Sequence, residues 1–314
     1  MAQESLSKDA GKQTETLAQL RCVAGKNDNI HKQLILIATI NIFLCSIAFL
    51  GNTLILVALR KESSLHPPSK LLYRCLATTD LCIALISEPS SVAYWLSFVS
   101  RDWKLCKFGL SAYFIASHTI CSVSILTMTA ISVDRLLALM LGLRYRQIVT
   151  LKRTYVVIAI FWILSVAAGA AYFVDYRISV SYGYTLIPLC LITATFSYTK
   201  IFHRLHRSRN QVQILISQQP SQPVSLNMAL YRNAVYSALW VQVAFVCCSL
   251  PYSIVAVVVP YDRLSPYDFI LLSCAESMFY LNSSLNPLLY CWKINEVRRA
   301  VKETLRQTFR CISV

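Results

Sequence analysis

The sequence predicts an all-α membrane protein, a bundle of seven membrane-spanning helices followed by a short amphipathic eighth helix. Of its 314 residues 56% are hydrophobic and only 14% are charged, whereas soluble domains average about 25% charged residues. The apolar residues are gathered in seven long runs. Each run is long enough to cross a bilayer as a helix, for which about 20 residues suffice, and too long and continuous for the strands of a membrane barrel.

The seven runs divide the chain into three parts. They cover residues 34–59, 71–99, 108–141, 155–174, 182–201, 234–259 and 269–291. We expect an extracellular N-terminal tail over residues 1–33, a seven-helix domain over residues 34–292, and an amphipathic helix with a short tail over residues 293–314. The runs contain no internal repeat that would indicate a second domain.

The basic residues indicate how the chain lies in the membrane. Most of the 30 Lys and Arg residues follow the first, third, fifth and seventh runs. The positive-inside rule places these segments in the cytoplasm and the N-terminus outside. Because the basic residues lie between apolar runs and form no nucleic-acid module, the net charge of +15 does not indicate a nucleic-acid partner.

The segment after the seventh run has an amphipathic pattern. Val297, Val301, Leu305 and Phe309 recur every four residues, with basic residues around them. This pattern predicts a helix on the inner leaflet of the membrane, and the alternative is a solvated charged tail. Cys311 comes after this helix and is a candidate for palmitoylation.

Several polar side chains lie within the apolar runs, where they need partners. Asp80 lies in the second run, Ser124 in the third, and Asn282, Ser283 and Asn286 in the seventh. An oxygen-rich cluster around one carboxylate suits a small hard cation such as Na⁺, or a proton. The alternative is a structural hydrogen-bond network between helices. Both interpretations agree with the residues themselves.

Six motifs fall in order along the chain and together carry a family resemblance. They are GN at 51–52, LATTD at 76–80, VDR at 133–135, Trp162, FVCCSLP at 245–251 and NPLLY at 286–290. Over nearly the whole chain the sequence resembles class A, rhodopsin-like G-protein-coupled receptors. The resemblance implies a non-enzymatic plasma-membrane receptor that binds an extracellular ligand and activates a heterotrimeric G protein. It also implies that the Asp80 cluster is an allosteric sodium pocket.

Two further segments resemble one branch of that family. Residues 143–153 are similar to the second cytoplasmic loop of melanocortin receptors. The short segment 175–183, which lacks Cys, also resembles that branch. Melanocortin, adenosine, cannabinoid and lysophospholipid receptors form this wider group.

The resemblance implies a G-protein switch at the inner end of the bundle. Its residues are Asp134, Arg135, Leu143, Tyr198, Pro251, Pro287 and Tyr290. In the family such an Arg pairs with its neighbouring acid at rest and engages the G protein when the sixth span moves outward. Here no Asp or Glu lies between His203 and Tyr261, so the sixth span lacks the acid that often holds the Arg. We therefore expect weak locking of the inactive state and raised basal signalling.

The resemblance also implies a ligand pocket in the outer half of the bundle. Its candidate residues are Glu88, Ser117, His118, Cys121, Tyr252, Glu276 and Tyr280. Glu88 and Glu276 can bind a cationic group or pair with Arg177 or Arg263 at the rim, and both alternatives stay open. Aminergic receptors have Asp where this chain has Ser117, and opsins have Lys where it has Tyr280. The ligand is therefore expected to be neither a classical amine nor retinal.

Three of the twelve cysteines lie on the predicted outer side of the membrane, where disulfides form. The usual disulfide of the family joins the third span to the second outer loop, which has no Cys here. Cys22 can pair with Cys106 or with Cys274, and the sequence does not decide between them.

Two other functions compete with that of a receptor. A transporter or channel with an intramembrane cation site would also need buried polar residues, but the chain shows no repeated halves with matching broken spans. A membrane metalloenzyme would need a ligand set. His203 and His206 lie in a basic stretch without carboxylate or Cys partners.

Overall fold

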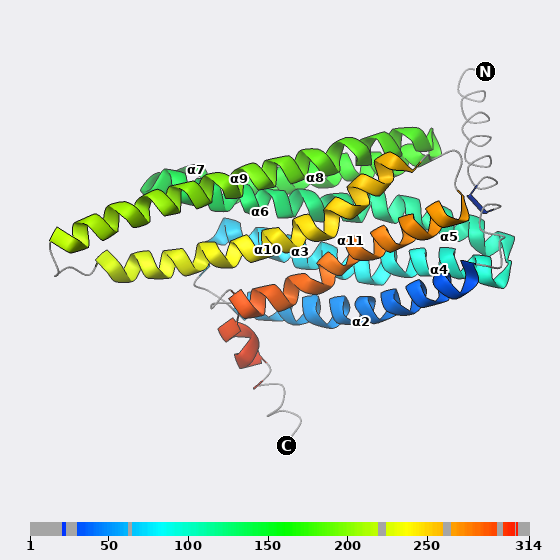
Figure 1. Ribbon diagram of the computed structural model, residues 1–314, viewed down its shortest axis with the longest axis horizontal. Coiled ribbons are helices and arrows are strands. Elements are labelled where there is room, and N and C mark those ends of the chain that lie inside the picture. Colours follow the sequence, from blue (N-terminus) through cyan, green and yellow to red (C-terminus); the bar gives the residue numbers. More distant parts are fainter. Residues whose placement is uncertain are drawn as a thin grey trace.

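The computed structural model describes residues 21–22, 30–61, 65–218, 224–259, 265–293, 298–304 and 306. Over these residues the regular structure is helical, and seven long helical segments run alongside one another (Figure 1). They are α2 (His31–Lys61), α3 with η2 and α4 (Pro67–Cys82, Ile83–Ser87, Glu88–Ser100), α5 with η3 and α6 (Trp103–Ala116, Ser117–Cys121, Ser122–Leu141), α8 (Leu151–Ala170), α9 (Tyr176–Gln218), α10 (Val224–Val258) and α11 (Pro266–Lys293). Each predicted run overlaps one segment, which confirms the predicted fold class.

Five of these segments are long and apolar enough to cross a membrane, among the residues that are described. They are His31–Lys61, Pro67–Ser100, Trp103–Ile148, Leu151–Phe173 and Tyr176–Arg204. Gln242–Val258, within α10, is a shorter apolar helix. The remaining segment, α11, carries the acidic side chain of Glu276 and the amide side chains of Asn282 and Asn286.

Local capping interactions fix where the helices begin. At the start of α11 the backbone N–H of Asp268 donates to Ser265 Oγ (3.2 Å), and the backbone N–H of Ser265 donates to Asp268 Oδ2 (3.0 Å). This reciprocal pair satisfies two backbone donors that the first turn leaves free. Asp102 caps α5 in a similar way by accepting from the backbone N–H groups of Lys104 (2.9 Å) and Leu105 (3.1 Å).

The fifth span begins earlier than the apolar run predicts, at Tyr176 rather than at residue 182. Its first turns are held by packing and by a polar contact. Tyr176 and Val180 are buried in an outer cluster with Phe114 and Tyr172. The Ser179 hydroxyl donates to the Ala168 carbonyl of α8 (2.7 Å). The segment read as a loop between the fourth and fifth spans is therefore largely helical.

Two short π-helical segments interrupt the second and third spans. η2 (Ile83–Ser87) lies just before Glu88, and η3 (Ser117–Cys121) contains three of the candidate ligand residues. A π segment inserts an extra residue into a turn and rotates the residues after it, and such segments occur frequently at functional sites. The hydrophobic period along the sequence did not predict either of them.

The helices meet most closely where small residues allow it. Gly51 in α2 faces Pro287 in α11, and a Cβ atom at this position would lie 2.8 Å from Pro287 Cβ and Cγ. Any larger side chain would push the two helices apart. Around this contact α11 packs against α2 and α10, while α6 packs against α3, α8 and α9.

The predicted eighth helix is described in part. Residues 298–304 are helical, and Ala300 and Val301 are buried against the inner core cluster. Val301 thus lies on the apolar side, as the pattern predicted. Val297, Leu305, Phe309 and Cys311 lie outside the described residues.

Candidate functional site

A buried carboxylate in the middle of the bundle joins three helices. Asp80 in α3 is fully buried. Its Oδ1 accepts hydrogen bonds from the hydroxyls of Ser124 in α6 (3.0 Å) and Ser283 in α11 (2.9 Å). Its Oδ2 accepts from Asn286 Nδ2 (2.8 Å). The structure therefore brings together four of the five residues predicted for the cation cluster.

Asn282, the fifth residue of that cluster, is buried but does not contact Asp80 in this way. Its Oδ1 and the Oδ1 of Asn286 have no hydrogen-bond partner among the described residues. Buried amide oxygens without a partner are costly. The amide oxygen of Asn286, the Asp80 carboxylate and the two serine hydroxyls that contact it form an oxygen donor set that fits a hard cation such as Na⁺.

The inner end of the bundle carries an ion pair with an elaborate set of partners. The Arg135 guanidinium lies 3.0 Å from Asp134 Oδ2 and 5.7 Å above the ring of Tyr73. Asp134 also accepts from the hydroxyls of Ser69 (2.9 Å) and Tyr145 (2.6 Å). These contacts tie α3, α6 and the α7 turn (Tyr145–Ile148) into one polar latch.

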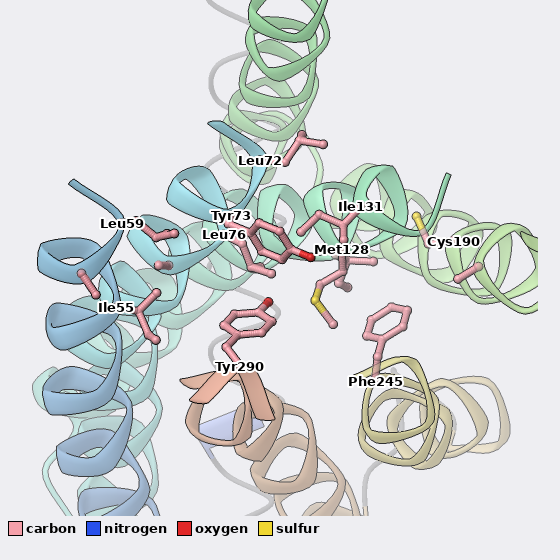
Figure 2. Close-up of a cluster of buried hydrophobic side chains, with 14 of the residues drawn as sticks. Ile55, Leu59, Leu72, Tyr73, Leu76, Met128, Ile131, Cys190, Phe245 and Tyr290 are labelled. Atoms are coloured by element: carbon pink, nitrogen blue, oxygen red, sulfur yellow. The ribbon is translucent and has the colours of Figure 1, made fainter. Parts of the chain in front are cut away.

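Tyr290 of α11 points from the opposite side toward the same region (Figure 2). Its ring packs edge-on against Tyr73, with 5.4 Å between the ring centroids. The Tyr290 hydroxyl is buried and has no hydrogen-bond partner among the described residues. Tyr198 and Phe245 are buried in the same region, from α9 and α10. Leu143, in contrast, is 97% exposed and projects from the η4 turn (Gly142–Arg144).

The outer half of the bundle encloses a cavity of about 60 Å³. Six of the seven predicted ligand residues line it, namely Ser117, His118, Cys121, Tyr252, Glu276 and Tyr280. The Tyr280 hydroxyl lies 2.8 Å from Ser91 Oγ and 3.2 Å from Ser117 Oγ, and Tyr113 donates to Glu276. Glu276 is the only acidic or basic side chain, apart from a histidine, among the residues that line this cavity.

The arrangement matches a known family along most of the chain. Residues 51–177 and 169–290 match the sequence profile described as "7 transmembrane receptor (rhodopsin family)". The chain belongs to this receptor family. The protein is thus a multi-pass plasma-membrane receptor, and a transporter or channel is not favoured. Members of the family bind extracellular ligands and heterotrimeric G proteins, and they are generally not enzymes.

Three relatives from different receptor classes are distant from this chain in sequence. It is 23% identical to a high-affinity lysophosphatidic acid receptor of Xenopus laevis, over 88% of this chain and 84% of the relative. It is 24% identical to the 5-hydroxytryptamine receptor 1B of Equus caballus (84% of each chain) and 23% identical to the adenosine receptor A3 of Ovis aries (87% and 90%). These similar identities do not favour one ligand class over another.

Glu88 does not line the receptor's outer cavity, although it is fully buried. Neither of its carboxylate oxygens accepts a well-formed hydrogen bond from the described residues. The Cys45 thiol of α2 is a polar neighbour, but it donates to the Ala84 carbonyl (2.8 Å). Glu88 and Glu276 therefore do not line one shared cavity in which a single cationic group would contact both.

The outer end of the receptor is tied down by a disulfide between Cys22 and Cys106, whose Cα atoms lie 6.2 Å apart. Cys274 is free and exposed. The disulfide anchors the preceding Arg21, which is buried and interacts electrostatically with Glu276. Arg177 and Arg263 were the rim residues considered as partners of Glu88 and Glu276. Arg177 is exposed, and its guanidinium lies 5.9 Å from the ring of Tyr176, whereas Arg263 lies outside the described residues.

Two inner contacts of the receptor were missed by the sequence interpretation. Ser69 and Tyr145 hold Asp134, and the Ser132 hydroxyl of α6 donates to Gln242 Oε1 of α10 (3.0 Å). The sequence interpretation paired Arg135 with its neighbouring acid, Asp134, but gave Asp134 no partner besides Arg135. The Ser132–Gln242 contact could have been predicted from the single Gln in the sixth apolar run, because a buried amide needs a polar partner on a neighbouring helix.

Proposed function

We propose that this receptor is activated by a ligand that binds in the outer cavity, and that it couples to a heterotrimeric G protein through Arg135 and the inner loops. The observation that carries the proposal is that the third span and α11 each contribute side chains both to the outer cavity and to the buried Asp80 cluster. Ser117 and Tyr280 line the outer cavity, and Ser124 and Asn286 hold Asp80 below it. The orientation is N-terminus outside and C-terminus in the cytoplasm, in keeping with the basic inner segments.

The ligand is neither a classical amine nor retinal, because Ser117 and Tyr280 stand where those receptors need Asp and Lys. Glu276 supplies the acidic group of the site. It is engaged by Tyr113 and by Arg21, so a ligand that uses this carboxylate has to share it with them or displace them. The small volume of about 60 Å³ fits a closed resting site that opens around its ligand.

Activation moves the inner part of α10 outward, with Pro251 and Pro287 as the points where α10 and α11 bend. The Ser132–Gln242 hydrogen bond has to break in this movement. A single neutral hydrogen bond contributes about 0.5–1.5 kcal/mol, less than one to a charged group. Weak locking of the inactive state and raised basal signalling are the consequence.

The Asp80 cluster binds Na⁺ in the resting state, and Cys311 is palmitoylated at the inner leaflet.

The proposal is tested by guanine-nucleotide exchange on a panel of purified heterotrimeric G proteins. Receptor in vesicles should stimulate exchange above receptor-free vesicles even without ligand, and a ligand found by library screening should raise it further. Arg135→Ala should abolish both signals. Arg177→Ala removes an equally charged, exposed arginine at the outer end of α9 and should retain them. Exchange that survives Arg135→Ala undiminished contradicts the proposed switch.

A further inference from the structure

A second, larger cavity lies away from the ligand site, between the inner parts of α6 and α8 and the segment 186–193 of α9. Its volume is about 510 Å³. Leu72 of α3 and Cys190 of α9 line it and also belong to the buried hydrophobic cluster of the bundle (Figure 2). Val157 of α8 and Leu189 of α9 line it and are 39% and 62% exposed, respectively. The cavity is therefore a slot that opens sideways toward the lipid.

At its outer end α8 approaches the third span closely. There a Cβ atom on Gly169 would lie 2.1 Å from Thr119 Oγ1 and 3.2 Å from the Ile115 carbonyl oxygen of the third span. Toward the inner end α8 presents Val157 and Phe161 to the slot without closing it against α9.

The walls of the slot are apolar, because the hydroxyls of its three threonines already donate hydrogen bonds within the bundle. The hydroxyls of Thr129, Thr154 and Thr193 each donate to the backbone carbonyl four residues earlier in the chain, at 2.9, 3.1 and 2.8 Å, respectively. Such hydroxyls turn their methyl groups outward. The remaining lining is mostly aliphatic and aromatic, so the slot suits an apolar chain.

The inner end of the slot carries a cation that has no acidic partner among the described residues. One N–H of the Arg153 guanidinium donates to the Ile148 carbonyl (2.7 Å). Asp134, the only carboxylate that lines the slot, is held by Arg135, Ser69 and Tyr145. The other donors of Arg153 form a planar fork that matches a phosphate or carboxylate group.

We propose that the slot binds one acyl chain of an anionic phospholipid from the inner leaflet, with the lipid phosphate on Arg153. The position of the headgroup rests on the proposed orientation, in which this end of the bundle lies in the cytoplasm. The bound lipid also contacts Ile148 and Val149 in the second inner loop. It therefore holds this loop beside the Asp134–Tyr145 contact on which the inner latch depends.

The test uses purified receptor in nanodiscs of phosphatidylcholine with a minor fraction of phosphatidylserine that carries a photoreactive acyl chain. Cross-linked peptides should map to the inner half of α8 and to the segment 186–193 of α9. After transfer to detergent, native mass spectrometry should detect retained phosphatidylserine. Arg153→Gln should lower this retention about tenfold, the effect of losing one charge-assisted hydrogen bond. Lys152→Gln changes a neighbouring exposed cation that does not line the slot and should have no effect.

A second pair of variants tests the slot itself. Val157→Trp fills the slot from a partly exposed position and should block cross-linking, whereas Val156→Trp, on the exposed neighbour that does not line the slot, should not. Glycerophosphoserine, the headgroup without chains, should not compete. Equal retention of phosphatidylcholine and phosphatidylserine, or retention unchanged by both Arg153→Gln and Val157→Trp, would show ordinary boundary lipid and overturn the proposal. Because these readouts need no signalling, they are independent of G-protein coupling.

Discussion

Asp80 and Glu88 are two fully buried carboxylates in the same membrane span, yet their surroundings are opposite. Asp80 accepts hydrogen bonds from Ser124, Ser283 and Asn286, on two neighbouring helices. Glu88 accepts no well-formed hydrogen bond from the described residues. Burial alone therefore does not show whether an acidic side chain is held by hydrogen bonds or lacks them. The difference lies in what the neighbouring helices present at each level of the bundle.

The π-helical segment η2 between the two residues explains why both face inward. They are eight residues apart, and in a regular α-helix, which turns about 100° per residue, Glu88 would lie about 80° around from Asp80. The extra residue in η2 cancels most of this rotation. Glu88 is thus turned into the bundle, near the Cys45 thiol of α2.

Asp80→Ala should have the largest effect of the changes that test this comparison. It leaves three buried donors without their acceptor, and each such donor costs about 1–3 kcal/mol. It also removes the charge on which cation binding depends. Purified receptor should melt at a higher temperature in sodium chloride than in choline chloride, because a ligand of the folded state stabilises it. The variant should melt lower and lose this difference.

Asn286→Ala serves as the second test of the same cluster, because it removes an amide and keeps the carboxylate. It should also abolish the sodium dependence of the melting temperature. Glu303→Ala, at an exposed acid of the helical segment 298–304, should change neither quantity. If wild type and both cluster variants respond equally to sodium, the cluster is a hydrogen-bond network only.

The Asp80 cluster and the seven spans could be predicted from sequence because they depend on regular periodicity. Asn282 and Asn286 are one helical turn apart, Asp80 is an acid in an apolar run, and η2 and η3 interrupt neither the segment around Asp80 nor the one from Ser124 to Arg135. Residues on uninterrupted α-helices keep their predicted faces. Asn282 shows the limit of this reasoning. It lies on the predicted buried face of α11, but its amide does not donate to Asp80.

The outer half was harder to predict, for two physical reasons. The π-helical segments rotate Glu88 and the region of Ser117, and nothing in the hydrophobic pattern marks them. The partner of Glu276 comes from Arg21, whose position depends on the disulfide at Cys22. Such contacts between segments far apart in the chain result from tertiary packing and not from local spacing. The Ser132–Gln242 contact was missed for the same reason.

Glu88→Met should have a smaller effect than Asp80→Ala and the opposite sign. Methionine has a similar length and is flexible enough to fill the site, and it removes two buried oxygens that lack hydrogen bonds. Replacing an unsatisfied buried polar group by an apolar one of similar shape is neutral or stabilising, here by up to about 1–3 kcal/mol. The melting temperature should rise, and its dependence on sodium should persist. A fall in melting temperature would mean that Glu88 has a partner in the folded receptor.

Cys45→Ala should have the smallest effect and decides whether Glu88 has any partner at all. The thiol is a weak donor and points to the Ala84 carbonyl, so its removal should cost less than about 1 kcal/mol beyond the lost packing. The informative quantity is its coupling to Glu88→Met in a double-mutant cycle of melting free energies. Independent effects are expected, because the carboxylate draws little stabilisation from the thiol. A coupling of more than about 1 kcal/mol would show that Cys45 satisfies Glu88 much as Ser124 and Ser283 satisfy Asp80. The contrast between the two carboxylates would then be one of degree, and the gain expected from Glu88→Met would disappear with it.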